Sequence, residues 1–253
     1  SYTVSEDFES DEEFEIDSNR LFLIPFQIYM ALFQHKHPYA PFLFDSAQKW
    51  IVGTLPPPRF TQGMLRSGDV DFCYGSRDGQ LWPILNQIFE LDLAFETTDK
   101  AIEQRKNFLL QRGIGICDIV DRAERERIDA SDLGMKNIEL RYLFSILKDY
   151  PKVTQLLFTG GNSKNGPEYL FRRHLKEKGL RLERISDSVP RIHRFRMSGA
   201  GASQRLITTV SLTAPSGSAN RAVGSLPEYK AKKAADPKYT TLDFRVEQYR
   251  RFM

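Results

Sequence analysis

Four short apolar segments rich in branched residues alternate along this chain with amphipathic helical patterns. Each ends in glycine, proline or a polar cluster, and they span residues 50–55, 115–120, 153–159 and 206–213. Segments of this length and composition are typical of buried strands. Because strands that alternate with helices need crossover connections, the pattern predicts a parallel sheet covered on both faces. We therefore expect a three-layer α/β/α fold around a central, mainly parallel four-stranded sheet.

Helical patterns fill the intervals between these segments and extend the chain at both ends. They cover residues 81–89, 98–112, 140–148, 167–178, 226–235 and 242–252. Residues 19–34 hold a further apolar cluster, which predicts a packed helix because it is too short to span a membrane. Residues 1–18 have no apolar period and are expected to form a disordered acidic head. Residues 19–253 then form a single α/β domain with N- and C-terminal helical extensions.

Composition excludes several classes of protein. With 253 residues, 41% of them hydrophobic and 27% charged, the chain matches soluble globular proteins. No apolar stretch is long enough for a membrane span, and the first residues are acidic where a secretion signal would be basic. Cys73 and Cys117 are too few for a disulfide scaffold or a cysteine-based zinc site. We expect an intracellular, cytoplasmic protein.

The net charge of +3 conceals an asymmetry between the two parts of the chain. The first 20 residues carry eight acidic side chains and one arginine, a net charge of −7, so the remaining residues carry +10. A basic body favours a polyanionic partner such as nucleic acid. A well-solvated surface of lysine and arginine explains the same charge equally well. The acidic head is either a separate tail or a shield for the basic face.

Small residues follow three of the predicted strands. The loops are Gly53–Phe60, Gly160–Glu168 and Ala214–Arg221, all rich in Gly, Pro, Ser or Asn. Loops of this kind let backbone N–H groups approach a ligand closely. Ligands of parallel sheets bind beyond the carboxyl ends of the strands. Each loop alone is explained by a turn, but three at one edge of a sheet predict a ligand crevice.

Motifs for common catalytic sites are absent from the sequence. It has no phosphate-binding P-loop and no G-x-S-x-G nucleophile motif. The histidines lack metal-ligand spacing apart from the close pair His35 and His37, which we expect at the surface. Asp69 and Asp71 form a pair of carboxylates that a polar turn explains as well as metal binding does.

The segment Asp71–Trp82 combines an aromatic side chain with charged ones ahead of a predicted helix. The Tyr74 ring could stack on a flat heterocycle, and the Asp78 carboxylate could orient a water molecule. Alternatively, the segment is a turn in which Asp78 caps the helix. Spacing alone favours neither interpretation.

The order of these motifs resembles the uracil-DNA glycosylase superfamily, nearest to its mismatch-specific uracil and hypoxanthine branches. The matching parts are Gly53-Thr-Leu-Pro-Pro, Tyr74 to Trp82, and Ala214-Pro-Ser-Gly, and the resemblance runs from about His37 to the C-terminus. It implies a monomeric, nucleoid-associated enzyme that flips a deaminated base out of DNA and hydrolyses its N-glycosidic bond with no cofactor or metal. Trp82 matches the buried tryptophan that opens the following helix.

The resemblance also implies a set of site residues. The base-binding residues would be Gly53, Thr54, Leu55, Pro56, Tyr74, Gly161 and Asn162, with backbone N–H groups of this set stabilising the leaving base. The DNA-binding residues would be Ser216, Gly217, Ser218 and Arg221. Arg221 would fill the gap left by the flipped nucleotide or contact a phosphate, because Ser218 and Ala219 are small. Asp78 is the candidate for positioning the catalytic water.

Three positions depart from the pattern of these branches. Leu55, Gly79 and Ala214 stand where the relatives carry polar catalytic side chains. Two alternatives therefore stay open beside the glycosylase. One is a catalytically weak or silent protein of the same fold that binds DNA or a nucleobase. The other is a nucleotide hydrolase that holds phosphate with the Gly160–Gly166 loop.

Overall fold

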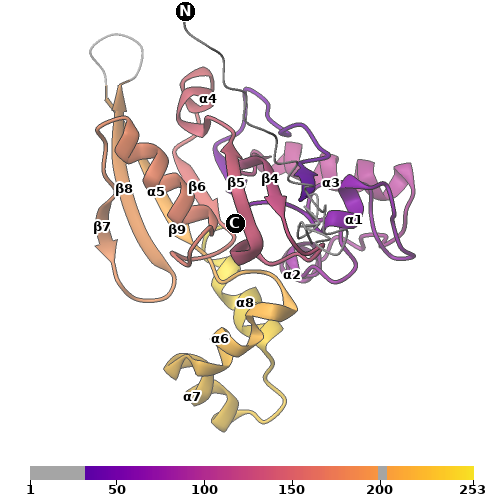
Figure 1. Ribbon diagram of the computed structural model, residues 1–253. Coiled ribbons are helices and arrows are strands. Elements are labelled where there is room, and N and C mark those ends of the chain that lie inside the picture. The colour runs from indigo at the N-terminus through magenta and orange to yellow at the C-terminus, as the bar shows by residue number, and fades with distance from the viewer. Residues whose placement is uncertain (1–31, 199–203) are drawn as a thin grey trace, which may run out of the picture. The chain divides into compact units, whose positions relative to one another are not determined.

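The structure is a computed structural model that describes residues 32–198 and 204–253 (Figure 1). All of them belong to one compact unit, residues 32–253. The predicted acidic head, residues 1–18, and most of the predicted helix over residues 19–34 lie outside the described residues.

A six-stranded sheet with the order β3-β2-β6-β9-β8-β7 forms the centre of the fold. Its four parallel strands are the four that the sequence predicts, namely β2 (Lys49–Val52), β3 (Ile114–Ile116), β6 (Gln155–Phe158) and β9 (Gln204–Ser211). The expectation of four strands is corrected by two antiparallel additions, β7 (Glu183–Ser186) and β8 (Arg191–Ser198). Strand β8 is rich in arginine, but its inward positions His193, Phe195 and Met197 alternate with exposed or half-buried ones.

A second, three-stranded antiparallel sheet was not expected from the sequence. It has the order β1-β4-β5, with β1 (Phe33–Lys36), β4 (Val120–Arg125) and β5 (Met135–Leu140), and the short helix η1 (Asp132–Gly134) lies in the β4–β5 hairpin. Two predicted boundaries are therefore wrong. Phe33 and Gln34 lie in a strand rather than in a helix, and the predicted strand 115–120 ends at Ile116, with Val120 starting β4. The charged outward positions of β4 conceal its strand pattern.

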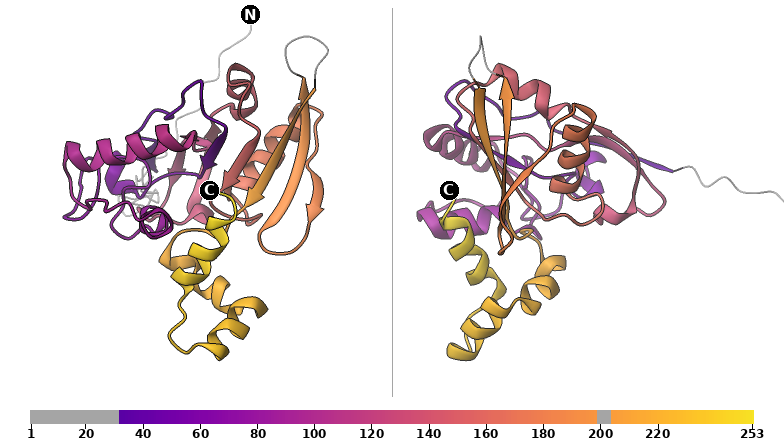
Figure 2. Two further views of the ribbon diagram at one scale, coloured as in Figure 1. Left: turned by 180° about the vertical axis from the view of Figure 1, so that it is seen from behind. Right: turned by 90° about the vertical axis from the view of Figure 1, so that its left-hand side faces the viewer.

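Helices cover both faces of the central sheet, as the three-layer prediction requires (Figures 1 and 2). The core on one face includes α2 (Leu81–Phe89), α3 (Asp99–Arg112) and α8 (Thr241–Arg250), and the core on the other includes α4 (Leu143–Asp149) and α5 (Pro167–Glu177). Successive side chains of a strand point to opposite faces. Trp50 and Val52 of β2 therefore lie in the second core, and Ile51 lies in the first.

The remaining helices follow two strands of the central sheet, β2 and β9. Helix α1 (Pro58–Thr61) follows β2, and the turn η2 (Gly217–Ala219), α6 (Asn220–Ser225) and α7 (Pro227–Ala235) follow β9. Helices α6 and α7 lie beyond the end of the sheet at which β9 finishes (Figure 2). No helix in the described ranges is both long and apolar enough to cross a membrane.

Asp69 organises the long loop between α1 and α2. Its buried carboxylate accepts hydrogen bonds from Arg59 Nε (2.9 Å) and Nη2 (2.8 Å) and from the backbone N–H groups of Arg66 and Arg77 (2.8 Å each). Burial raises the pKa of Asp69, but these donors outweigh it and bring the pKa to about 2. The other carboxylate of the pair, Asp71, accepts the Tyr39 hydroxyl at 2.7 Å, so the two acids serve separate contacts and do not form a metal site.

Replacement of Asp69 by asparagine should destabilise the protein. The change removes the buried partner of Arg59 and leaves it the exposed Asp78 carboxylate at 3.5 Å, at a cost of about 3 kcal/mol near neutral pH. Because the folded pKa of about 2 is below the ordinary value of 3.8, this stabilisation is present above pH 4 or so and is lost as the pH falls toward 2. Urea denaturation at several pH values, with Asp71→Asn as the matched control, measures both effects. Equal behaviour of the two variants would contradict the role of Asp69.

Candidate active site

The carboxyl ends of β2 and β6 meet at the point where the chain reverses its direction across the sheet. The chain passes from β2 to β3 on one side and from β6 to β9 on the other. Parallel sheets commonly bind ligands beyond the strand ends at such a point, and this edge of the sheet is called the crevice below. Gly53 follows β2, Thr159 follows β6, and Asp118 lies just beyond β3. A Cβ on Gly53 would be 2.9 Å from Thr159 Oγ1 and 3.0 Å from Asp118 Oδ1, so these residues are in direct contact.

The Asp118 carboxylate is buried at this edge and has three hydrogen-bond donors. Oδ1 accepts from the Gly53 N–H (2.7 Å) and the Tyr74 hydroxyl (2.7 Å), and Oδ2 is 2.9 Å from His37 Nε2. His37 Nδ1 accepts the Tyr39 N–H at 3.1 Å. The proton of a neutral His37 ring therefore resides on Nε2, which donates it to Asp118.

Tyr74 is held rigidly over the crevice. Its backbone has φ = 59°, in the left-handed region, and its hydroxyl also lies 3.3 Å from Thr159 Oγ1. Burial, followed by the charge of Asp118, raises the pKa of Tyr74 well above its ordinary value, so the phenol remains a hydrogen-bond donor. The residue as a whole is only half-buried.

A second carboxyl group, Asp132, belongs to η1 in the β4–β5 hairpin. Its Oδ1 accepts the Thr54 hydroxyl at 2.7 Å, and its backbone carbonyl accepts Asn165 Nδ2 at 3.0 Å. Burial is the largest effect on Asp132 and raises its pKa to about 6. The hydrogen bond from Thr54 and the charge of Arg125 lower this pKa, whereas the charge of Asp118 raises it. A carboxyl group with this pKa can accept or release a proton close to neutral pH.

The structure brings together some of the predicted base-binding residues. Gly53, Thr54 and Tyr74 lie at the crevice with Asp118 and Asp132. The loop continues through Leu55 and Pro56, which are half-buried, and Leu55 packs against the core. Gly161 and Asn162 follow Thr159 and Gly160 but are exposed, and a Cβ on Gly161 would meet nothing within 4 Å.

The loop after β9 is fixed to the loop that carries Tyr74. Gly79 forms an isolated antiparallel bridge with Ser216, and the Gln80 N–H donates to the Pro215 carbonyl at 2.8 Å. From the other side, the buried guanidinium of Arg245 donates to the carbonyl of Ala214 (2.8 Å) and to that of Ser216 (3.0 Å).

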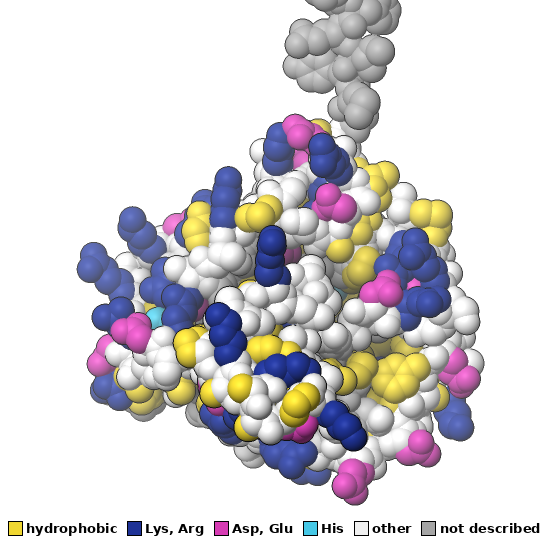
Figure 3. All heavy atoms as spheres, turned by 90° about the horizontal axis from the view of Figure 1, so that it is seen from below, with side chains coloured by type: hydrophobic (Ala, Val, Ile, Leu, Met, Phe, Trp, Pro, Cys, Tyr) yellow, Lys and Arg dark blue, Asp and Glu magenta, His cyan; other side chains and the backbone are white. Residues whose placement is uncertain are grey.

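The predicted DNA-binding residues occupy the outer part of this loop. Ser216 precedes the short turn η2, which contains Gly217 and Ser218, and the Ser216 and Ser218 hydroxyls are 3.0 Å apart. Arg221 is exposed in α6. Figure 3 views the molecule from the side of α6–α8, where Lys and Arg side chains are spread over the face with Asp and Glu among them.

Asp78 does not cap the following helix, so that alternative is wrong. The N-cap residue of α2 is Gln80, because the chain makes one further turn, closed by the Gly79 N–H and the Ser76 carbonyl, before the helix begins. The Asp78 side chain is 67% exposed, and one of its oxygens is 3.5 Å from Arg59 Nη2. Its role in positioning water stays a prediction. Trp82, by contrast, is buried in α2 as the resemblance implies.

The expectation that His35 and His37 lie at the surface is wrong. Both side chains are buried, because alternate residues from β1 onward point inward. His35 Nδ1 accepts Arg125 Nε at 2.7 Å, and burial, followed by the charge of Arg125, lowers the pKa of His35 to about 4. The ring is therefore neutral near physiological pH.

Sequence reasoning missed Asp118, His37 and Asp132. A signal existed for Asp118, since a single carboxylate within the apolar run Ile116–Val120 must find hydrogen-bond partners when it is buried. The spacing of two between His35 and His37 was a signal for a strand. The sequence holds no such signal for Asp132, because this residue lies in a hairpin that is distant in the sequence from its partner Thr54.

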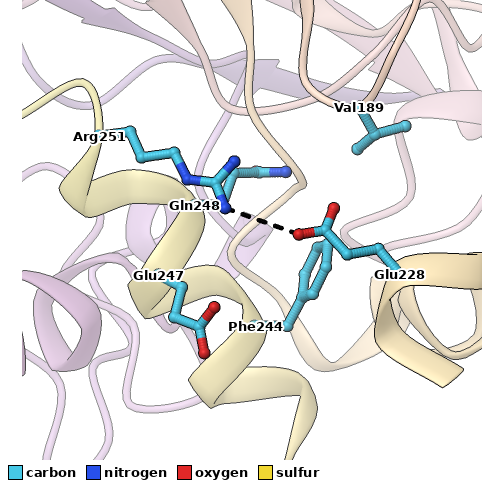
Figure 4. Close-up of a pocket in the computed structure, with 6 residues that line it drawn as sticks. All are labelled: Val189, Glu228, Phe244, Glu247, Gln248 and Arg251. Carbon is cyan, nitrogen blue, oxygen red and sulfur yellow. Dashed lines mark ion pairs between the residues drawn. The ribbon is translucent and has the colours of Figure 1, made fainter. Parts of the chain in front are cut away.

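No three His, Cys, Asp or Glu side chains gather in a possible metal site within residues 32–198 and 204–253. Cys73 and Cys117 are both buried free thiols. A separate hollow where α7 and α8 approach each other is lined by Val189, Glu228, Phe244, Glu247, Gln248 and Arg251 (Figure 4). The Arg251 guanidinium points toward Glu228, with 3.6 Å between nitrogen and oxygen. This hollow shares no residue with the crevice.

Comparison with known proteins finds a weak match to a solved structure. No family model and no curated protein matches the sequence. Among solved structures, the solution structure of a protein from Methanosarcina acetivorans, provisionally described as a uracil DNA glycosylase, matches with a TM-score of 0.47 and 18% identity. The match covers 85% of this chain and 99% of that one. At this level of similarity, the match by itself assigns neither a substrate nor an activity to this chain.

Gly53→Ala should push Tyr74 away from Asp118. The added Cβ would lie 2.2 Å from the Tyr74 hydroxyl, far inside van der Waals contact. The loss of stability should shrink by about 1 kcal/mol or more in a Tyr74→Phe background, because residues in contact are energetically coupled. Urea denaturation of the double-mutant cycle measures this coupling. Gly161→Ala, where a Cβ meets open space, is the control, and additive effects of Gly53→Ala and Tyr74→Phe would contradict the contact.

Proposed function

We propose that this chain is a DNA N-glycosylase that acts on a deaminated base, uracil or hypoxanthine, flipped out of DNA. One observation carries the proposal: a tyrosine that is not fully buried is fixed by its hydroxyl at the crevice of a parallel sheet, where two carboxyl groups bind the loop and the tyrosine. The tyrosine is Tyr74, and the carboxyl groups belong to Asp118 and Asp132. The order of the sequence motifs that resemble the glycosylase superfamily supports the same assignment.

Tyr74 provides the binding surface for the base. An enzyme that reacts at the glycosidic bond takes the nucleotide out of the stack, so the extruded base needs a new flat partner. Stacking on an aromatic side chain contributes about 1–3 kcal/mol. The Tyr74 hydroxyl is hydrogen-bonded to Asp118 before any ligand binds, so the side chain loses little conformational entropy on binding.

Asp132 provides the proton acceptor for hydrolysis. The oxygen of a water molecule forms a bond to the sugar C1′ while the bond between C1′ and the base nitrogen breaks. The water proton passes to the Asp132 carboxylate, and the electron pair of the broken bond leaves with the base. Backbone N–H groups of Thr54, Leu55 and Gly161 would stabilise the departing base, at about 3 kcal/mol for each well-placed donor.

The charge of the chain suits a DNA substrate. Residues 21–253 carry a net charge of +10, and Arg221 is an exposed cation in α6, just after the loop that follows β9. A phosphate contact by Arg221 would position the DNA without reading its sequence. The protein would act as a monomer, with no cofactor, on damaged DNA inside the cell.

A silent binding protein of the same fold is the second candidate. Leu55, Gly79 and Ala214 have no polar side chain at the positions where the related branches carry their catalytic groups. Such a protein would bind a base at Tyr74 without cutting the glycosidic bond. Excision assays on single- and double-stranded oligonucleotides with uracil, hypoxanthine or xanthine separate the two candidates. Release of a free base supports the enzyme, and lesion-selective binding without release supports the silent protein.

Asp132→Asn should abolish most of the excision activity. Loss of the proton acceptor should lower the single-turnover rate by about a hundredfold or more. In the wild type, the rate should rise with pH through about 6, as the carboxyl group loses its proton, and this acid limb should disappear in the variant.

Asp78→Asn is the matched control, since it changes an exposed carboxylate of the neighbouring loop. A rate that depends on Asp78 and not on Asp132 would return the assignment to the residue that the sequence indicated. Both variants need an unchanged melting temperature for the comparison to count.

A further inference from the structure

A hollow of about 630 Å³ lies between strand β5 and helix α5, two elements that can be followed in Figure 1. One wall consists of residues 138–142, at the end of β5 and just beyond it. The opposite wall consists of side chains between residues 170 and 177 of α5. Gly53, Tyr74 and Asp118 do not line this hollow, so a ligand bound here would leave the crevice accessible.

Strand β5 forms the edge of its sheet, because in the order β1-β4-β5 it pairs with β4 alone. Leu140 lies opposite Val120, and the N–H of the next residue, Arg141, donates to the Ile119 carbonyl at 2.8 Å. In an antiparallel ladder, bonds in this position flank a pair of residues whose own N–H and C=O groups point away from each other. Leu140 therefore directs one backbone donor and one backbone acceptor to the free edge of the sheet.

His174 lines the hollow from the side of α5. It is 1% exposed, and its Nε2 has no hydrogen-bond partner in the part of the chain that the structure describes. Burial lowers the pKa of His174, so the imidazole is neutral near physiological pH. A buried nitrogen without a partner is unfavourable, and a ligand that hydrogen-bonds to Nε2 would remove this cost.

Tyr142 places an exposed aromatic ring beside this histidine. Its residue is 65% exposed, and its ring centroid is 5.9 Å from that of His174. The backbone of Tyr142 is fixed, because it is the N-cap residue of α4 and its carbonyl accepts the N–H groups of Ser145 (2.9 Å) and Ile146 (3.0 Å). The hollow thus combines a free strand edge, an unpartnered buried nitrogen and an exposed ring.

The charge of the hollow is opposite in sign to that of the rest of the protein. Residues 21–253 carry a net charge of +10, whereas the hollow is lined by three carboxylates and two guanidinium groups, those of Asp121, Glu139, Glu177, Arg141 and Arg173. Asp121 and Glu139 lie 3.6 and 2.7 Å from arginine side chains. Glu177 adds an exposed carboxylate one helical turn after His174. A cationic ligand therefore suits this surface, since Tyr142 can bind it through its ring face and Glu177 through its charge.

We propose that the hollow binds an extended, basic segment of a partner protein, which adds a strand to the edge of β5 and places a lysine or arginine between Tyr142 and Glu177. Strand addition joins main-chain hydrogen bonds, here to Leu140, with side-chain contacts at alternate residues. From Leu170 to Glu177, α5 rises about 10 Å, which matches about three residues of an extended chain. The proposal goes beyond the proposed function and applies whichever ligand the crevice binds.

The test is a titration of the ¹⁵N-labelled full chain with blocked seven-residue peptides, followed by NMR. A peptide of alternating lysine and valine should bind with a Kd below about 1 mM and move the Leu140 amide proton downfield, because that N–H gains an acceptor. A peptide of alternating glutamate and valine should bind about tenfold more weakly or not at all.

N-methylated peptides test the strand geometry. In an extended chain, the N–H groups of alternate residues point to opposite edges. N-methylation of all the lysines removes the donors of one edge, and N-methylation of all the valines removes those of the other. One of the two modified peptides should lose binding, whereas the other should keep it.

Variants of the two side chains that contact the cation complete the test. Glu177→Gln and Tyr142→Ala should each weaken binding of the basic peptide by about fivefold, and Tyr142→Phe should retain it, because the ring face is kept. The matched control is Glu103→Gln, which changes an exposed carboxylate of α3 on the other face of the central sheet and should have no effect.

Several outcomes would overturn the proposal. They are no binding of the basic peptide, an unchanged Leu140 amide, equal loss or equal retention of binding by the two N-methylated peptides, and equal effects of Glu177→Gln and Glu103→Gln. A shift of the Leu140 amide caused by free uracil, or by higher protein concentration alone, would assign the hollow to a base or to a second copy instead. None of these measurements depends on base excision, so they are independent of the proposed glycosylase activity.

Discussion

The rest of the site depends on the burial of one carboxylate, that of Asp118. A buried charge is costly unless hydrogen-bond donors surround it, so its donors must be held as firmly as the strand that carries it. Those donors come from three parts of the chain: Gly53 at the end of β2, Tyr74 in the loop before α2, and His37 just beyond β1. Asp118 thereby connects the two sheets and fixes the aromatic ring at the crevice before any ligand binds.

The same arrangement explains why Gly53 and Tyr74 occur together. The Tyr74 hydroxyl occupies the space where a side chain at position 53 would lie, so only glycine permits the hydrogen bond to Asp118. The loop that holds Tyr74 in a left-handed conformation is in turn supported by Asp69, which binds Arg59 and two backbone N–H groups. A flat ligand would therefore bind to a ring whose position is already set. Little conformational entropy of the side chain would be lost on binding.

The sequence was a good guide to features that arise from regular apolar patterns. All four parallel strands and the extent of α2 over Leu81–Phe89 follow from such patterns. Strands β1, β4 and β5 were missed, because charged residues occupy their outward faces and the predicted helix at residues 19–34 took in Phe33 and Gln34. At the site, Gly53 and Tyr74 were found from local motifs. Asp118 and Asp132 were not, because their roles depend on contacts between distant segments, with Gly53 in one case and Thr54 in the other.

We infer that the crevice at Gly53, Tyr74 and Asp118 receives a base extruded from DNA. The most direct measurement is a crystal structure of the protein bound to a duplex with a 2′-fluoro nucleotide of the preferred lesion, since the fluorine resists formation of an oxocarbenium-like state. We expect the lesion base to lie outside the helix and to stack on the Tyr74 ring, with its sugar C1′ facing Asp132. A lesion base that stays within the duplex, or that binds at a surface away from Tyr74, would contradict it.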